Sequence, residues 1–209
     1  MTKQGVVGVS GVIAVLCMGW VGALNAAEAG SKSTLDNLQA AYNGESNAKV
    51  RYEAFAVKAD EEGYKSVAAL FRAAAKSEGV HADKHAAAIK KLGAEPKATI
   101  EKADVKSTKE NVEASAKGEA DEGAVMYPAF IKQAEADKNA GAALSFKGAK
   151  ATEESHAALF KQALSELDSW KAAGKVFLVC QICGYTTMNS ALQKCPICAA
   201  PRAKFDVIK

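Results

Sequence analysis

The chain has 209 residues, enough for one medium-sized domain and a small one. It carries 27 basic and 24 acidic residues, for a formal net charge of +3. Basic and acidic side chains are interspersed, which argues against a nucleic-acid-binding protein, because such proteins concentrate basic residues on one face. Alanine, lysine and glutamate dominate residues 34–173 and prolines are rare, a composition typical of helical proteins.

Residues 1–29 have the pattern of a secretory signal peptide. Lys3 is followed by an uncharged run over residues 4–27, and Ala27 and Ala29 occupy the small-residue positions of a cleavage site. We therefore expect an exported, periplasmic protein from which this leader is removed. The run is also long enough to span a bilayer, so the alternative is a membrane-anchored protein with an uncleaved N-terminal helix.

Residues 30–174 are expected to form an all-α, ferritin-like four-helix bundle. Capping-box patterns begin at Ser33 and Ser107, and glycines stand where helices should stop. The expected helices cover residues 33–61, 64–92, 107–137 and 139–173. Short links pair the first helix with the second and the third with the fourth. The long link over residues 93–107 is typical of the crossover in such a bundle.

The two halves of this region repeat each other. Glu45 matches Glu119 at an offset of 74 residues, and Tyr52 matches Tyr127 at an offset of 75. At the second offset, "SEGVH" (residues 77–81) has its counterpart in "TEESH". Each half therefore supplies one glutamate from its first helix and a Glu-x-x-His pair from its second.

Six side chains are thereby expected to face one core: Glu45, Glu78, His81, Glu119, Glu153 and His156. Four buried carboxylates are prohibitively costly without compensating positive charge. One glutamate from each of two helices and Glu-x-x-His from the other two is the signature of di-iron or di-manganese bundles. A surface Glu–His contact is the alternative for a single pair, but it would have to occur twice in register.

Three other side chains near this constellation have different expected roles. Tyr52 and Tyr127 match across the halves, and we expect them to hydrogen-bond the carboxylate ligands, with ordinary core aromatics as the alternative. His85 has Phe160 as its counterpart. It is expected to be a solvated or internally satisfied helix residue and no ligand.

The spacing within the repeat predicts a helix irregularity. Tyr52 follows Glu45 by seven positions, but Tyr127 follows Glu119 by eight. One extra residue in a helix that stays in register at both ends indicates a π-bulge, a feature frequent at functional sites. Such a bulge would turn Glu122 toward the metals as a seventh ligand. The alternative is a solvated Glu122 with the insertion absorbed elsewhere.

Residues 175–209 hold two C-x-x-C pairs, formed by Cys180, Cys183, Cys195 and Cys198. This spacing predicts a four-thiolate metal site in a segment too short to be stable without the metal. The ligands alone do not separate zinc from iron. Two disulfides are a further alternative in an exported protein.

Over residues 34–207 the chain resembles the rubrerythrin family, which joins a ferritin-like di-iron bundle to a rubredoxin-like domain. The motifs that carry the resemblance are "NGES", "SEGVH", "GEADE", "MYPAF", "EESH", "CQICGY" and "CPIC". The resemblance implies a di-iron peroxidase that reduces hydrogen peroxide to water in oxidative stress protection, with electrons relayed by one iron in the four-cysteine site.

The resemblance also implies roles for the ligands. Five residues would hold the iron pair: Glu45, Glu78, Glu119, Glu153 and His156. Glu122 and His81 would serve the same iron in different oxidation states. The implied partners are a rubredoxin- or cytochrome-like electron donor and a second copy in a head-to-tail homodimer. The alternative is a ferroxidase that handles iron as ferritins do. Two features depart from the family pattern: the short segment "GYTTMNSALQK" between the cysteine pairs, and the leader.

Overall fold

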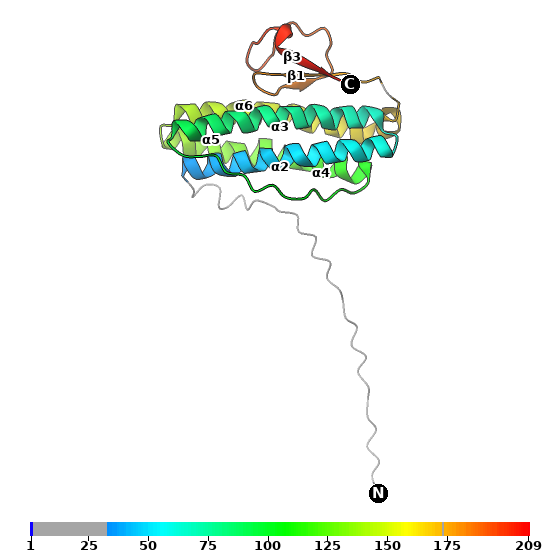
Figure 1. The fold of residues 1–209 in the computed structure, drawn as a ribbon, viewed down its shortest axis with the longest axis horizontal. Coiled ribbons are helices and arrows are strands. Elements are labelled where there is room, and N and C mark those ends of the chain that lie inside the picture. The colour runs from blue at the N-terminus through cyan, green and yellow to red at the C-terminus, as the bar shows by residue number, and fades with distance from the viewer. Residues whose placement is uncertain (2–32, 173) are drawn as a thin grey trace.

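The computed structural model describes residues 1, 33–172 and 174–209, so the expected leader lies almost entirely outside the described residues. Residues 33–165 form the predicted bundle of four long helical segments (Figure 1). Helices α2 (Thr34–Glu61) and α3 (Lys65–Lys91) make the first antiparallel pair. Among the described helices, none is both long and apolar enough to cross a membrane.

The link between the two helix pairs runs along α2 in an extended path (Figure 1). Amide side chains of α2 hold it there. Gln39 Nε2 donates to the carbonyl oxygen of Glu95 at 2.7 Å, and Asn47 Nδ2 donates to that of Thr99 at 2.9 Å. These contacts satisfy backbone groups that no regular secondary structure would pair.

The third helical segment contains the predicted irregularity. It consists of α4 (Thr108–Asp121), a π-helical turn η1 (Glu122–Met126) and α5 (Tyr127–Ala136). The extra residue is thus absorbed in the interval between Glu119 and Tyr127, as its spacing predicts. The two capping boxes at Ser33 and Ser107 are also confirmed.

The fourth helix, α6 (Ala140–Ser165), ends earlier than the expected residue 173. A 3₁₀ turn, η2 (Leu167–Trp170), follows. This turn buries the Trp170 side chain completely, with its ring centroid 6.1 Å from that of Phe177. The helix therefore stops where the chain must bend to pack the tail, and the glycine at 174 does not end it.

The tail forms a small antiparallel sheet of order β2-β1-β3, made by β1 (Phe177–Cys180), β2 (Thr186–Thr187) and β3 (Phe205–Ile208). A short 3₁₀ turn, η3 (Arg202–Lys204), precedes β3. The sheet lies over α3 and α6 of its own bundle (Figure 1). The tail thus folds back along the bundle from the point where α6 ends.

Two apolar clusters fill the bundle on either side of a polar middle layer. One is built around Phe55, Phe71 and Phe160, and the other around Phe130 and Phe146. The predicted ligands fall between these clusters along the helices. The three histidines of the chain are at most 1% exposed, so the polar layer lies buried between the two clusters.

Candidate metal centres

The structure brings the six predicted ligands of the bundle into two overlapping groups. One group contains Glu45, Glu78, His81 and Glu153, and the other contains Glu78, Glu119, Glu153 and His156. Within each group one ligand atom from each residue lies within 4.8 Å of the others, and all six residues are at most 2% exposed. Glu78 and Glu153 belong to both groups. They would therefore contribute to both positions of a two-metal site.

The two groups mirror each other as the sequence repeat predicts. His81 Nδ1 lies 2.9 Å from Glu78 Oε2 and 3.0 Å from Glu153 Oε1. His156 Nδ1 lies 3.2 Å from Glu78 Oε1 and 3.0 Å from Glu153 Oε2. Each shared carboxylate thus directs one oxygen toward each histidine.

The chemistry of these atoms fits a pair of metal cations. Both carboxylate oxygens of Glu78 and of Glu153, Oε2 of Glu45 and Nδ1 of His81 are buried without a hydrogen-bond partner among the described residues. Burial and the nearby Glu78 carboxylate raise the pKa values of Glu45 and Glu119 well above the usual range. Two divalent cations would neutralise this charge and satisfy the unpaired atoms.

Both matched tyrosines hydrogen-bond ligand carboxylates, as predicted. The Tyr52 hydroxyl donates to Glu119 Oε1 at 2.5 Å, and the Tyr127 hydroxyl donates to Glu45 Oε1. Outer hydrogen bonds of this kind hold ligands in a fixed orientation. Each tyrosine reaches across the bundle to the opposite half of the repeat.

His85 is buried and satisfied, and it is no member of either ligand group. Its Nε2 lies 3.1 Å from the Tyr127 hydroxyl, and its Nδ1 lies 2.9 Å from Ser145 Oγ. Burial lowers the pKa of His85 to about 3. The imidazole is therefore neutral, with one donor and one acceptor nitrogen.

Glu122 lies at the start of the π-helical turn but outside both ligand groups. Glu122 and His81 are expected to serve the same metal position, and in this structure His81 is the one that belongs to a ligand group. Burial, together with the carboxylates of Glu153 and Glu78, raises the pKa of Glu122 to about 8. Its carboxylate is half-buried and close enough to the ligands to be affected by their charge.

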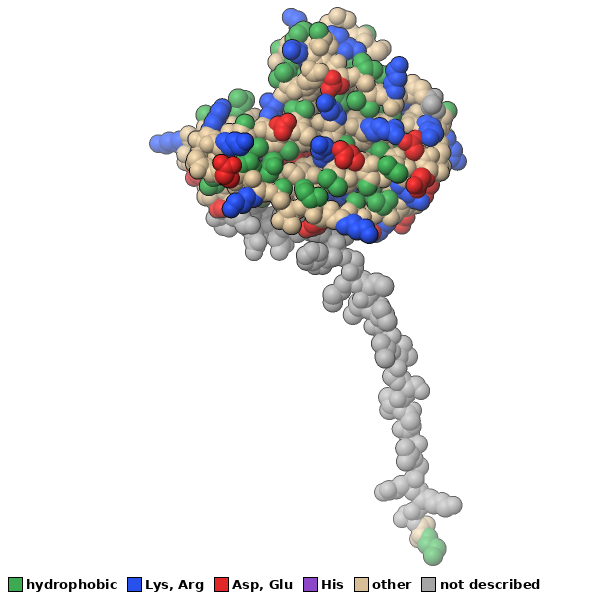
Figure 2. Space-filling view, viewed as in Figure 1, with side chains coloured by type: hydrophobic (Ala, Val, Ile, Leu, Met, Phe, Trp, Pro, Cys, Tyr) green, Lys and Arg blue, Asp and Glu red, His purple; other side chains and the backbone are tan. Residues whose placement is uncertain are grey.

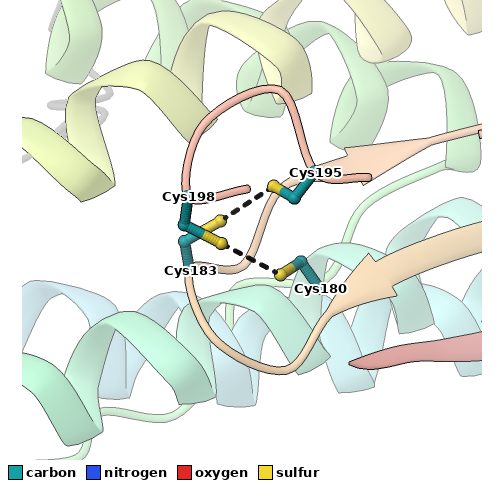
Figure 3. Close-up of side chains that lie close together, drawn as sticks. All are labelled: Cys180, Cys183, Cys195 and Cys198. Atoms are coloured by element: carbon teal, nitrogen blue, oxygen red, sulfur yellow. Dashed lines mark hydrogen bonds between the residues drawn. The ribbon is translucent and has the colours of Figure 1, made fainter. Parts of the chain in front are cut away.

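The four cysteines of the tail converge on one point (Figure 3). Cys180 Sγ lies 3.6 Å from Cys198 Sγ, and Cys183 Sγ lies 3.5 Å from Cys195 Sγ. A tetrahedral site with metal–sulfur bonds of about 2.3 Å has sulfur–sulfur edges of about 3.8 Å, close to these separations. All four are free cysteines, which favours a metal site over the alternative of two disulfides.

The tail contacts both ligand histidines of its own bundle, an arrangement that the sequence did not reveal. His81 Nε2 lies 3.1 Å from the carbonyl oxygen of Cys183, and His156 Nε2 lies 3.2 Å from Thr186 Oγ1. With Nδ1 of each ring bound to a metal, Nε2 would carry the hydrogen and donate it. One residue of the four-cysteine site is thus one hydrogen bond away from a ligand of the bundle site.

Gly184 allows this close approach. Its backbone has a φ of +84°, and a Cβ at this position would lie 2.5 Å from Ser77 Oγ and 2.6 Å from His81 Nε2. Ser77 Oγ also donates to the Gly184 carbonyl oxygen at 2.8 Å. Only glycine satisfies both the backbone conformation and the contact.

A surface groove of about 430 Å³ leads to the bundle site beside the π-helical turn. Glu119, Gly123 and Ala124 line one wall, and residues of α6, including Lys150 and Glu154, line the other. Lys150 and Glu154 form an ion pair with a separation of 2.5 Å. A small polar molecule can approach the Glu119 side of the site along this groove.

Comparison with known proteins gives the same division of the chain. The rubrerythrin family profile matches residues 36–164, and the profile of the rubrerythrin rubredoxin-like domain matches residues 179–206. Nigerythrin from Nitratidesulfovibrio vulgaris is 38% identical over 83% of this chain and 85% of its own length. Rubrerythrin-2 from Clostridium acetobutylicum is 33% identical over 82% of this chain and 95% of its own length.

A solved structure has a similar fold. The structure described as the fully reduced, all-ferrous state of nigerythrin has a TM-score of 0.79 and 36% sequence identity, covering 84% of this chain and 87% of that one. The match extends over both the bundle and the tail. The fold class and the two metal sites expected from the sequence are therefore confirmed.

Proposed function

The chain belongs to the rubrerythrin family, and we propose that it is a peroxidase that reduces hydrogen peroxide to water in oxidative stress protection. Its cofactors are two irons in the bundle and one iron in the four-cysteine tail. Iron bound in the bundle would supply the two electrons that reduce the O–O bond. Seven residues are proposed to serve the iron pair: Glu45, Glu78, His81, Glu119, Glu122, Glu153 and His156.

One observation carries this proposal: the hydrogen bond from His81 Nε2 to the carbonyl oxygen of Cys183. It connects a ligand residue of the tail site to a ligand residue of the bundle site within one chain. A repeatedly reduced enzyme needs such a connection, because peroxide consumes two electrons in every turnover. Iron storage does not need it, which makes the ferroxidase the weaker candidate.

The residues around the site have separate tasks. Tyr52 and Tyr127 hold the Glu119 and Glu45 carboxylates in place by hydrogen bonds. The apolar clusters on both sides exclude bulk water, which strengthens every electrostatic interaction in the site. The groove beside Gly123 would admit the small substrate, and Glu122, at the start of the π-helical turn next to Gly123, is proposed as an exchangeable seventh ligand.

The charge of the tail favours an acidic electron donor. Residues 174–209 contain five basic residues and one acidic residue, Asp206. Lys76 of α3 pairs with Asp206 at 3.2 Å, so this single negative charge is already compensated. On the face shown in Figure 2, blue side chains are prominent on the tail, whereas blue and red are mixed over the bundle. We infer that a rubredoxin- or cytochrome-like carrier with an acidic surface docks here.

The cellular location of the protein is proposed from the signal-peptide pattern of residues 1–29. We infer that the protein is exported and cleaved near Ala29. The donor would then be an exported carrier, because nicotinamide donors are not available outside the cytoplasm. Mass spectrometry of the native N-terminus tests this: a chain beginning at Met1 or Thr2 in the cytoplasm contradicts it.

The proposed activity is tested by mixing the anaerobically reduced, iron-loaded protein with either hydrogen peroxide or dioxygen. Stopped-flow absorbance should show that peroxide oxidises the bundle irons faster than dioxygen does. Repeated additions of peroxide with a reductant should give steady turnover. Faster oxidation by dioxygen, with added ferrous iron accumulating as a ferric mineral, would support the ferroxidase instead.

A further inference from the structure

A buried row of hydrogen bonds leads away from Glu45 on one side of the bundle site. It passes from the Glu45 carboxylate to the Tyr127 hydroxyl, then to His85 and finally to Ser145 Oγ. Tyr127 and His85 have no exposed surface, whereas Ser145 keeps 9% exposure beside Leu144, which is 73% exposed. The row therefore joins the metal site to the edge of the bundle.

The hydrogen bonds of this row all point in one direction. Tyr127 donates its only hydrogen to Glu45, so its oxygen must accept from His85 Nε2. The neutral imidazole then has no hydrogen on Nδ1, and this atom accepts from the Ser145 hydroxyl. Every donor is thus aimed inward, from the surface toward the carboxylate of Glu45.

The other half of the bundle lacks this row. Tyr52 donates to Glu119 in the same way, but its neighbours at the matching positions are Phe160 in place of His85 and Leu70 in place of Ser145. The ring centroids of Tyr52 and Phe160 lie 5.5 Å apart, and both replacements are fully buried and apolar. The repeat is therefore broken at the two positions that make a polar path.

We propose that Ser145, His85 and Tyr127 form a proton relay that serves the Glu45 side of the site alone. The proposal rests on the peroxidase function, in which two electrons from the reduced metals and two protons convert one hydrogen peroxide into two waters. One of these protons passes along the row. The Tyr127 proton moves to Glu45, which passes one proton to a peroxide oxygen as the O–O bond breaks, the His85 Nε2 proton moves to Tyr127, and the Ser145 proton moves to His85 Nδ1.

Surface water then restores the Ser145 proton. Each passage leaves His85 with its hydrogen on Nδ1, so the imidazole must turn over before the next. On the Glu119 side, Tyr52 has no such row beyond it, because Phe160 and Leu70 stand at the matching positions, and the groove lies there instead.

The tautomer of His85 tests the direction of the relay without any turnover. In the zinc-substituted protein, which is diamagnetic, ¹⁵N NMR of labelled histidine should show His85 neutral, with its hydrogen on Nε2. Replacing Ser145 with alanine should change the Nδ1 signal, since it loses its donor. A hydrogen on Nδ1, or an imidazolium, would overturn the proposal whatever the enzyme does with peroxide.

Kinetics of the iron-loaded enzyme test transfer itself. Ser145→Ala and His85→Phe should lower peroxide turnover by roughly tenfold or more, in the lower range of general acid–base contributions, and should alter the solvent deuterium isotope effect. Ser115→Ala is the matched control, because Ser115 is a buried serine of α4 that bonds only a backbone carbonyl oxygen. It should leave both quantities unchanged.

His85→Gln separates a relay from a positioning role. Glutamine can donate to Tyr127 and accept from Ser145, but it cannot exchange one hydrogen for another as imidazole does. Continued slow turnover in this variant supports the relay, whereas full recovery would reduce His85 to positioning Tyr127. Wild-type kinetics in Ser145→Ala and His85→Phe would contradict the relay, while a wild-type protein inert to peroxide would contradict the peroxidase function itself.

Discussion

Gly184 is the residue on which the connection between the two metal sites depends most. Its positive φ excludes most side chains, and the space beside it is already occupied by Ser77 and His81. The backbone of the tail can approach His81 only because no Cβ lies between them. This residue therefore controls whether Cys183 and His81 stay in hydrogen-bond contact.

Gly184→Ala should slow electron transfer from the tail iron to the bundle irons while sparing peroxide oxidation of a fully reduced bundle site. Gly63→Ala is a matched control: Gly63 has a φ of +81° and nothing within 4 Å of its Cβ position. Both variants carry a backbone cost of about 1–2 kcal/mol. Stopped-flow absorbance should show slower oxidation of the tail iron by the bundle site in Gly184→Ala only. Equal rates of tail-iron oxidation in the two variants would contradict the assigned role.

The candidate ligands of the bundle site follow directly from the internal repeat of the sequence. The six bundle ligands and two tyrosines could be predicted because each occurs twice in register, as Glu78 and Glu153 do. The tail contacts to His81 and His156 could not be predicted, because periodicity within helices says nothing about where a small appended domain packs. Gly184 appeared only as the residue after a cysteine pair.

At the scale of elements, the π-helical turn has the clearest consequence. It was predictable by counting residues between matched positions, because a helix can keep its register on both sides only by absorbing the extra residue locally. The end of α6 was not predictable in the same way. Gly174 suggested a stop, but the need to bury Trp170 ended the helix at Ser165.

Glu122→Ala should leave the bundle folded but slow peroxide turnover, shifting the protein toward slower oxidation by dioxygen. The reason is that the variant loses a carboxylate that favours the more oxidised iron. Glu113→Ala, at an exposed glutamate of α4, is the control and should match the wild type. Circular dichroism checks the fold and stopped-flow rates with each oxidant check the chemistry. Peroxide kinetics equal to the control would remove Glu122 from the proposed site.

At the scale of the whole molecule, the tail folds back onto its own bundle. A head-to-tail homodimer was expected because a tail attached beyond a long helix should lie far from its own bundle site. That reason was wrong: Cys183 contacts His81 of the same chain. The homodimer itself stays a prediction, which sedimentation can test.

The basic tail should determine how the electron donor docks. Lys194 and Lys204 are exposed lysines of the tail. The double variant Lys194→Glu/Lys204→Glu should slow reduction of the tail iron by an acidic carrier protein. The difference should shrink as salt is added, because screening shortens the range of the attraction to about 3 Å at 1 M. Lys102→Glu, on the exposed crossover link, is the control. Equal rates in all three proteins at low salt would contradict an acidic donor.

The central claim is that the tail iron reduces the bundle irons after peroxide has oxidised them. It is tested most directly by mixing the fully reduced protein with one equivalent of hydrogen peroxide and following the spectra of both iron sites. The bundle site should be oxidised first and the tail site afterward. Cys183→Ser should keep the first phase at its wild-type rate, lose the second and lose steady turnover. A wild-type tail that stays reduced after the peroxide is consumed, or a Cys183→Ser variant that turns over at the wild-type rate, would contradict the account.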